Sequence, residues 1–294
     1  MKPPAVLARL RGVPNRSGAP LRGEALQAAA QEADAVRLAI DIADIPRTEL
    51  RGTRPDGEES FLDRLATLRA GEDPIVAYDS MRFLDFDRID NPSGAVQFTK
   101  GSERLTVINV NRQALEHTTG ADLIYVNEML DSFVLVQYKA LRPEKTPDGH
   151  TRLVYRPDGQ LAAELERMRH IKIGRDDDSL SGYRLDASCG FLKLCKPVAR
   201  VDHDPRELVS GMYIPLDYYN RLVASDQVTG PRGGTVLSHD TVRRYLNNDL
   251  FVQLVRGAWI GSHGTTSTRL TKIVLDGLEA KRSMTIAALS SGST

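Results

Sequence analysis

The stretches TGADLIYV, at residues 119–126, and SFVLVQYKA, at residues 132–140, decide the fold of this chain. Both are rich in β-branched and aromatic residues, which favour strands. Only the short polar-rich connection NEMLD separates them. Two strands joined by so short a connection pair as an antiparallel hairpin. The sequence therefore predicts a β-hairpin at the centre of the protein.

Further strands and helices are predicted on both sides of this hairpin. Period-two apolar patterns predict strands at residues 75–78, 104–110, 151–155, 183–185, 191–195, 211–214 and 283–288. Three- and four-residue apolar spacing predicts helices at residues 24–42, 58–69, 159–170, 216–224, 238–248 and 268–281. Elements mixed in this way predict an α/β fold of the mixed α+β type, with a central mixed β-sheet flanked by helices.

The order of these patterns divides the chain into three regions. We expect a helical N-terminal region at residues 1–74, a core at residues 75–175 and an α+β C-terminal region at residues 176–294. The N-terminal region carries no pattern typical of chemistry, so its expected role is packing or partner contact. The C-terminal region is expected to be accessory, in contact with a partner or with nucleic acid.

Composition excludes several classes of protein. The 294 residues include 39 basic and 39 acidic residues, so the molecule as a whole does not attract polyanions, and any such binding must be local. Two cysteines exclude a disulfide framework, and we interpret Cys189 and Cys195 as buried small residues rather than zinc ligands. No apolar run is long enough to cross a bilayer. These features predict a cytoplasmic protein without membrane contact.

Three polar residues interrupt the apolar hairpin at one of its ends. Asp122 stands at the start of the first strand, and Gln137 and Lys139 stand near the end of the second. A spacing of two on a strand places Gln137 and Lys139 on one face. Phosphodiester hydrolysis needs hard oxygen ligands for a divalent metal ion and a lysine that orients water or neutralises charge. Asp122, Gln137 and Lys139 are therefore the candidate reaction centre.

The string TGADLIYV…FVLVQYKA resembles the PD-(D/E)xK nuclease superfamily, which has the restriction-endonuclease-like fold. It is most similar to the branch in which Gln replaces the second acid, as in Mrr-type restriction enzymes. The resemblance covers residues 100–172 and implies DNA cleavage that depends on Mg²⁺, for which Mn²⁺ can substitute. It implies metal ligation by Asp122, by the oxygen of Gln137 and by the backbone carbonyl of Tyr138, with Lys139 as the catalytic lysine.

The same resemblance implies an additional upstream acid. Glu116 is the candidate for this catalytic and metal-binding role, with Glu103 in reserve. Gln137 is neutral, so the site holds one fewer negative charge than its acidic counterparts and depends more strongly on such a residue.

Basic residues are concentrated after the hairpin. Residues 137–175 contain nine Lys or Arg against five acids before Asp176. One interpretation is a phosphate-binding track, and the other is a solvated surface with pairs such as Glu164 and its neighbouring arginines. On the first interpretation, the candidate nucleic-acid contacts are Arg142, Lys145, Arg152 and Arg156.

Two functions follow from these patterns. The first is an Mg²⁺-dependent endodeoxyribonuclease that a nucleic-acid-sensing partner or self-association activates, as in a bacterial defence effector. The second is a catalytically inactive module of the same fold that binds nucleic acid or a protein partner. A third hypothesis, a structural subunit, requires neither metal nor Lys139.

Overall fold

A computed structural model describes the chain in segments. The described residues are 31, 34–35, 37–44, 52–53, 95–100, 103–110, 119–127, 129–130, 132–146, 148–170, 180, 182–185, 189–197, 208–231, 233–262 and 284–291. Among the predicted elements, the helices at 58–69 and 268–281 and the strand at 75–78 lie outside these residues.

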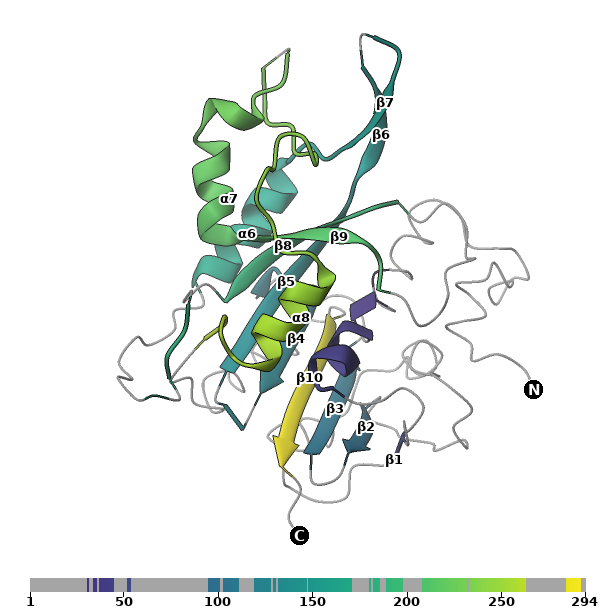
Figure 1. The fold of residues 1–294 in the computed structure, drawn as a ribbon, viewed down its shortest axis with the longest axis vertical. Coiled ribbons are helices and arrows are strands. Elements are labelled where there is room, and N and C mark those ends of the chain that lie inside the picture. The colour runs from purple at the N-terminus through teal and green to yellow at the C-terminus, as the bar shows by residue number, and fades with distance from the viewer. Residues whose placement is uncertain are drawn as a thin grey trace, which may run out of the picture.

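The centre of the fold is a mixed eight-stranded sheet (Figure 1). Its strands, in spatial order, are β1 (Gly52–Thr53), β2 (Ala95–Lys100), β3 (Glu103–Val110), β10 (Met284–Ser291), β4 (Leu123–Asn127), β5 (Ser132–Ala140), β8 (Gly190–Cys195) and β9 (Gly211–Pro215). The β10–β4 and β5–β8 pairs are parallel, and the other pairs are antiparallel. The predicted mixed sheet is therefore confirmed. The boundary expected at residue 175, between the core and the C-terminal region, runs through this sheet, because β8, β9 and β10 follow that position.

The β4–β5 hairpin has the predicted antiparallel pairing. Leu123 pairs with Val136, and Asn127 pairs with Ser132 at the other end. The backbone N–H of Asp122 continues the ladder by donating to the Val136 carbonyl at 2.9 Å. Asp122 therefore lies beside the Gln137 end of β5.

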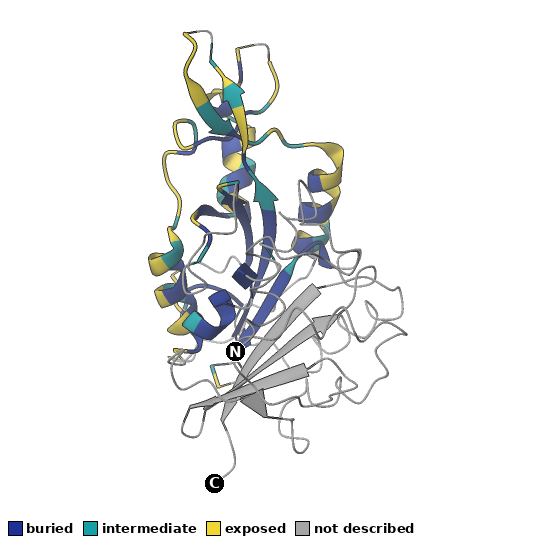
Figure 2. Ribbon diagram, turned by 90° about the vertical axis from the view of Figure 1, so that its right-hand side faces the viewer, coloured by how far each residue is buried: buried dark blue, intermediate teal, exposed yellow. Residues whose placement is uncertain are grey.

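Helices cover both faces of the sheet. On one face lie the helical residues 34–35 and 37–42, here called the N-terminal helix, together with α8 (Asn248–Arg256). On the other face lie α6 (Gly159–His170) and α7 (Leu216–Val223). Because helices cover both faces, β4, β8 and most of β5 are buried without interruption and are mostly apolar (Figure 2).

Helix α6 connects the parallel strands β5 and β8. It begins at Gly159 because the Asp158 carboxylate accepts a hydrogen bond from the Leu161 N–H at 2.8 Å, which caps the helix. Leu161, Leu165 and Met168 form its buried stripe against the sheet, as the sequence predicts.

Two predicted elements are wrong. Residues 183–185 form no strand. Residues 239–241 form a turn rather than a helix, because the Ser238 hydroxyl accepts from the Thr241 N–H at 3.3 Å and the Thr241 hydroxyl accepts from the Ser238 N–H at 2.9 Å. Helix α8 begins only at Asn248, where the Asn247 side chain accepts from the Leu250 N–H.

A two-stranded ribbon projects from the end of β5 (Figure 1). It consists of β6 (Arg142–Lys145) and β7 (Thr151–Val154), which pair only with each other. Its root is fixed because Tyr155 and Leu237 exchange backbone hydrogen bonds of 2.8 and 2.9 Å. The short helix η1 (Asp226–Val228) precedes the Leu237 segment. None of the helices in the described segments has the length and apolar character needed to span a membrane.

Candidate functional site

A close contact between a turn and a helix builds one side of the site. Gly120 has φ +69°, and a Cβ at this position would lie 1.9 Å from the backbone carbonyl oxygen of Glu164. Only glycine adopts this conformation readily and leaves room for the helix backbone. The turn that leads into Asp122 is therefore packed directly against α6 at Glu164.

Asp122 contacts both the side chain of Gln137 and the backbone of Tyr138. Its Oδ2 accepts hydrogen bonds from Gln137 Nε2 and from the Tyr138 N–H, each at 2.7 Å. Gln137 Nε2 also donates to the Tyr138 carbonyl oxygen at 3.3 Å. The Asp122 carboxylate and the Tyr138 carbonyl are two of the three expected oxygen ligands. Both therefore lie around Nε2 of Gln137, the residue expected to supply the third.

The orientation of the Gln137 amide determines what this group can bind. Gln137 is buried, and its Oε1 has no hydrogen-bond partner among the described residues. A half-turn of the amide exchanges its two ends and turns Oε1 toward Asp122 Oδ2 and the Tyr138 carbonyl. Three oxygens so close together repel one another unless a cation lies among them. These residues therefore fit a divalent metal ion with a preference for hard oxygen ligands.

Lys139 forms an ion pair with a helix residue. Its Nζ lies 2.6 Å from Glu164 Oε2, and Gln160 Nε2 donates to Glu164 Oε1 at 2.9 Å. Lys139 is 17% exposed and Glu164 only 1%, so the lysine reaches the surface and the carboxylate does not. Glu164 thereby fixes a cationic group on the α6-facing side of β5, two residues beyond Gln137.

The structure brings Asp122, Gln137 and Tyr138 into direct contact and pairs Lys139 with Glu164. Glu116 lies outside the described residues. For Glu103, only the backbone is described, where it pairs with Lys100 and Ser291. Within the described segments, no three His, Cys, Asp or Glu side chains gather into a metal-binding group. A metal ion here would accordingly depend on amide and carbonyl oxygens in addition to the Asp122 carboxylate.

The four predicted nucleic-acid contacts lie on or beside the projecting ribbon. The Glu144 carboxylate accepts hydrogen bonds of 3.0 to 3.1 Å from Arg156 and lies 3.5 Å from Arg152 Nη2. Hydrogen bonds from Arg156, followed by its charge and by Arg152, hold the pKa of Glu144 below its usual value. The single Glu144 carboxylate therefore pairs with two of the four cationic side chains, and Arg142 and Lys145 are exposed on β6.

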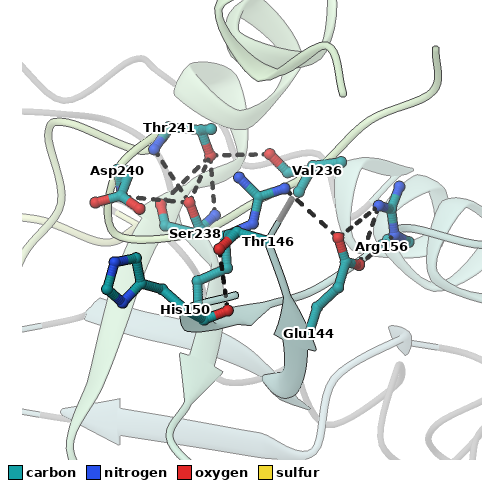
Figure 3. Close-up of polar contacts among 9 residues, drawn as sticks. Glu144, Thr146, His150, Arg156, Val236, Ser238, Asp240 and Thr241 are labelled. Carbon is teal, nitrogen blue, oxygen red and sulfur yellow. Dashed lines mark hydrogen bonds and ion pairs between the residues drawn. The ribbon is translucent and has the colours of Figure 1, made fainter. Parts of the chain in front are cut away.

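The turns around the ribbon are closed by their own side chains. The Thr146 hydroxyl donates to the His150 carbonyl at 3.0 Å, and the Thr241 hydroxyl donates to the Val236 carbonyl at 2.8 Å (Figure 3). His150, Asp148 and Gly149 are exposed at the tip. The ribbon is thus an ordered projection that begins three residues after Lys139.

Glu164 and Gly120 are the site residues that sequence reasoning missed. The sequence placed Glu164 on a helix with arginine neighbours, and its partner is instead Lys139 on the adjacent strand. A signal was present, because position 164 lies on the same helical stripe as Leu161, Leu165 and Met168, where a charge requires a buried partner.

No family model, curated protein or solved structure matches this chain.

Proposed function

We propose that this protein is an Mg²⁺-dependent nuclease that hydrolyses phosphodiester bonds of DNA. In this proposal β4, β5, α6 and β8 form a restriction-endonuclease-like core of the PD-(D/E)xK type, with Gln137 in place of the second acid. The observation that carries the proposal is the convergence of the Asp122 carboxylate, the Gln137 amide and the Tyr138 carbonyl on one position.

Asp122, Gln137 through Oε1, and the Tyr138 carbonyl would hold the metal, and Glu116 is the proposed further acid. When bound, Mg²⁺ supplies an acidified water and charge neutralisation at the phosphate. Mn²⁺ prefers the same oxygen donors and is expected to substitute.

Lys139 and Glu164 have the other roles in the proposed reaction. The Lys139 ammonium orients the attacking water and neutralises the charge that develops at phosphorus. The water oxygen forms a bond to phosphorus and loses a proton to solvent, the ester P–O bond breaks, and the leaving oxygen takes up a proton from solvent, so that one water is consumed for each bond cut. Glu164 holds Lys139 in place, since an ion pair of 2.6 Å to a buried carboxylate restricts an otherwise flexible side chain.

The substrate is proposed from the surroundings of the site. Arg142 and Lys145 are exposed on the ribbon that follows Lys139, where they can meet phosphates on either side of the bond that is cut. Because the net charge of the chain is zero, we expect modest affinity for DNA alone. Activation by a nucleic-acid-sensing partner or by self-association, as in a bacterial defence effector, would compensate for this modest affinity.

A second candidate is an inactive module of the same fold that binds nucleic acid or a protein. One observation favours it. The Gln137 amide presents its nitrogen to Asp122, so a neutral donor satisfies the carboxylate without a metal.

The experiment that separates the two functions is plasmid cleavage by the purified full chain in Mg²⁺, Mn²⁺ or EDTA, repeated with Lys139→Ala. The nuclease cuts in either metal, is silent in EDTA and loses about 100-fold or more of its rate in the variant. An intact plasmid under all conditions, with DNA retained in a gel-shift assay, would support the inactive module. Cleavage that survives Lys139→Ala would contradict the assigned site.

A further inference from the structure

A buried ion pair lies on the opposite face of the sheet from Lys139 and Glu164. Lys193 of β8 and Asp34 of the N-terminal helix are both fully buried, and the Lys193 ammonium contacts Asp34 Oδ2. Asp34 Oδ1 accepts a hydrogen bond from the Val209 N–H. One carboxylate thus connects the helix to β8 and to the segment that precedes β9.

The Lys193 ammonium also lies over two aromatic rings. Its Nζ is 5.0 Å from the ring centroid of Tyr138 and 4.9 Å from that of Tyr213. Both distances are within the range of cation–π attraction. Burial alone would lower the pKa of Lys193, but the Asp34 charge, with Tyr213 and Cys195, outweighs it and leaves the pKa raised. The ammonium is therefore held as a cation between Asp34 and the rings.

Tyr138 connects this pair to the proposed metal site. It pairs in register with Lys193 in the parallel β5–β8 ladder, so both side chains point to the face of the N-terminal helix. The neighbours of Tyr138, Gln137 and Lys139, point to the opposite face. The backbone of Tyr138 serves the site directly, since its N–H donates to Asp122 and its carbonyl faces the Gln137 amide.

The residues that surround Lys193 do not require a charged side chain at this position. Leu38, Phe191, Tyr213 and Phe251 make this part of the core, and an apolar side chain in place of Lys193 would be in keeping with them. Replacing both members of a buried ion pair by apolar residues is often neutral for stability, whereas removing one member is costly. Such pairs can instead specify one arrangement among several packed alternatives.

We infer that the Asp34–Lys193 pair is a positioning device, through which the N-terminal helix holds the Tyr138 ring and thereby fixes the Tyr138 backbone beneath Asp122. The inference depends on the proposed function for its biological meaning, because the fixed backbone is the proposed metal ligand. Asp34 and Lys193 are positioning residues and do not touch the substrate. Docking of the Asp34 end of the N-terminal helix then becomes a condition for an assembled site.

The test uses the full chain in three forms. Asp34→Asn/Lys193→Met removes both charges together and keeps a side-chain oxygen that can accept from the Val209 N–H, so no buried charge is left without its partner. The matched control is Arg256→Ala, which loosens the other end of the same helix, where Arg256 donates to the Ile42 carbonyl at 3.1 Å and pairs with Asp44 at 2.9 Å. The readouts are amide exchange at Tyr138 by NMR and the Mg²⁺ concentration that gives half-maximal cleavage.

The inference predicts that the double variant keeps a melting temperature near that of the wild type, while the Tyr138 amide exchanges roughly tenfold faster or more. The Mg²⁺ concentration that gives half-maximal cleavage rises in the same variant. Arg256→Ala changes neither readout. Unchanged exchange at Tyr138 in the double variant, or equal acceleration in Arg256→Ala, would overturn the inference. If the wild type fails to cleave DNA in Mg²⁺ or Mn²⁺, the proposed function fails, and the exchange comparison still decides the positioning role.

Discussion

At the scale of single residues, the neutral side chain of Gln137 is the most informative feature. Its amide nitrogen donates to Asp122, and its buried oxygen has no partner within the described part of the chain. An acid at this position would place two carboxylates side by side. We therefore expect glutamine to stabilise the Asp122 carboxylate where a second acid would repel it.

Gln137→Glu tests this role. We expect the metal-free protein to lose about 1–3 kcal/mol of unfolding free energy, because the new carboxylate lies beside Asp122. Mg²⁺ should bind roughly tenfold more tightly, because its site gains a negative charge. Thermal melts with and without Mg²⁺ and titration calorimetry measure both effects. Gln253→Glu, on the exposed side of α8, is the control, and equal effects in both variants would contradict the assignment.

The second residue-scale prediction concerns Glu164. Glu164→Gln removes the partner that holds Lys139, and we expect the cleavage rate to fall about 10- to 100-fold. Glu166→Gln is the matched control, because Glu166 is exposed on the same helix and pairs with Arg169 at 2.7 Å. Steady-state assays at saturating Mg²⁺ compare the two variants. A wild-type rate in Glu164→Gln would remove Glu164 from the site.

At the scale of elements, the approach of the Gly120 turn to α6 joins β4 to the helix. The sequence predicts β5 and α6 with their observed ends, since their apolar patterns are strong and local. It does not predict the β6 strand, which consists of Arg, Pro, Glu and Lys, because its pairing depends on β7 and on the Glu144 ion pairs. Nor does it predict that α6 turns Glu164 toward Lys139, because a helix pattern does not specify which strand it covers.

Gly120→Ala tests the contact between turn and helix. The new Cβ would meet the Glu164 carbonyl oxygen at 1.9 Å, and we expect a loss of about 3 kcal/mol or more from clash and backbone strain together. Gly149→Ala isolates the strain, because Gly149 has φ +85° with nothing within 4 Å of an added methyl group, and it should cost only about 1 kcal/mol. Urea unfolding measures both. Equal losses would show that the helix does not pack on this turn.

At the scale of the whole molecule, strands from distant parts of the sequence form one sheet. The sequence predicts the strands β8, β9 and β10 but not their places in the sheet, because pairing between distant segments leaves no local pattern. The same holds for the Asp34–Lys193 pair, whose members are 159 positions apart. The string CGFLKLC predicts both thiols on one face, yet Cys189 precedes the first residue of β8 and packs with the α6 side, whereas Cys195 packs with the other.

These two cysteines report on the cooperativity of the fold. Burial raises the pKa of each thiol to about 12, so both stay protonated and unreactive toward iodoacetamide at pH 8 in the folded protein. Unfolding returns the pKa to its ordinary value and exposes the thiolate. If the two faces of the sheet unfold together, both cysteines become labelled at the same urea concentration by mass spectrometry. Separate transitions would show that the faces are independent units.

The central claim is that Asp122, Gln137 and the Tyr138 carbonyl together hold a divalent metal ion. The most direct measurement is a crystal structure grown with Mn²⁺, with the ion located by its anomalous scattering. We expect a peak bound by the Asp122 carboxylate and the Tyr138 carbonyl, with the Gln137 amide rotated so that Oε1 faces the ion. A structure in which Gln137 Nε2 still donates to Asp122 and Mn²⁺ lies elsewhere, or nowhere on the protein, would contradict it.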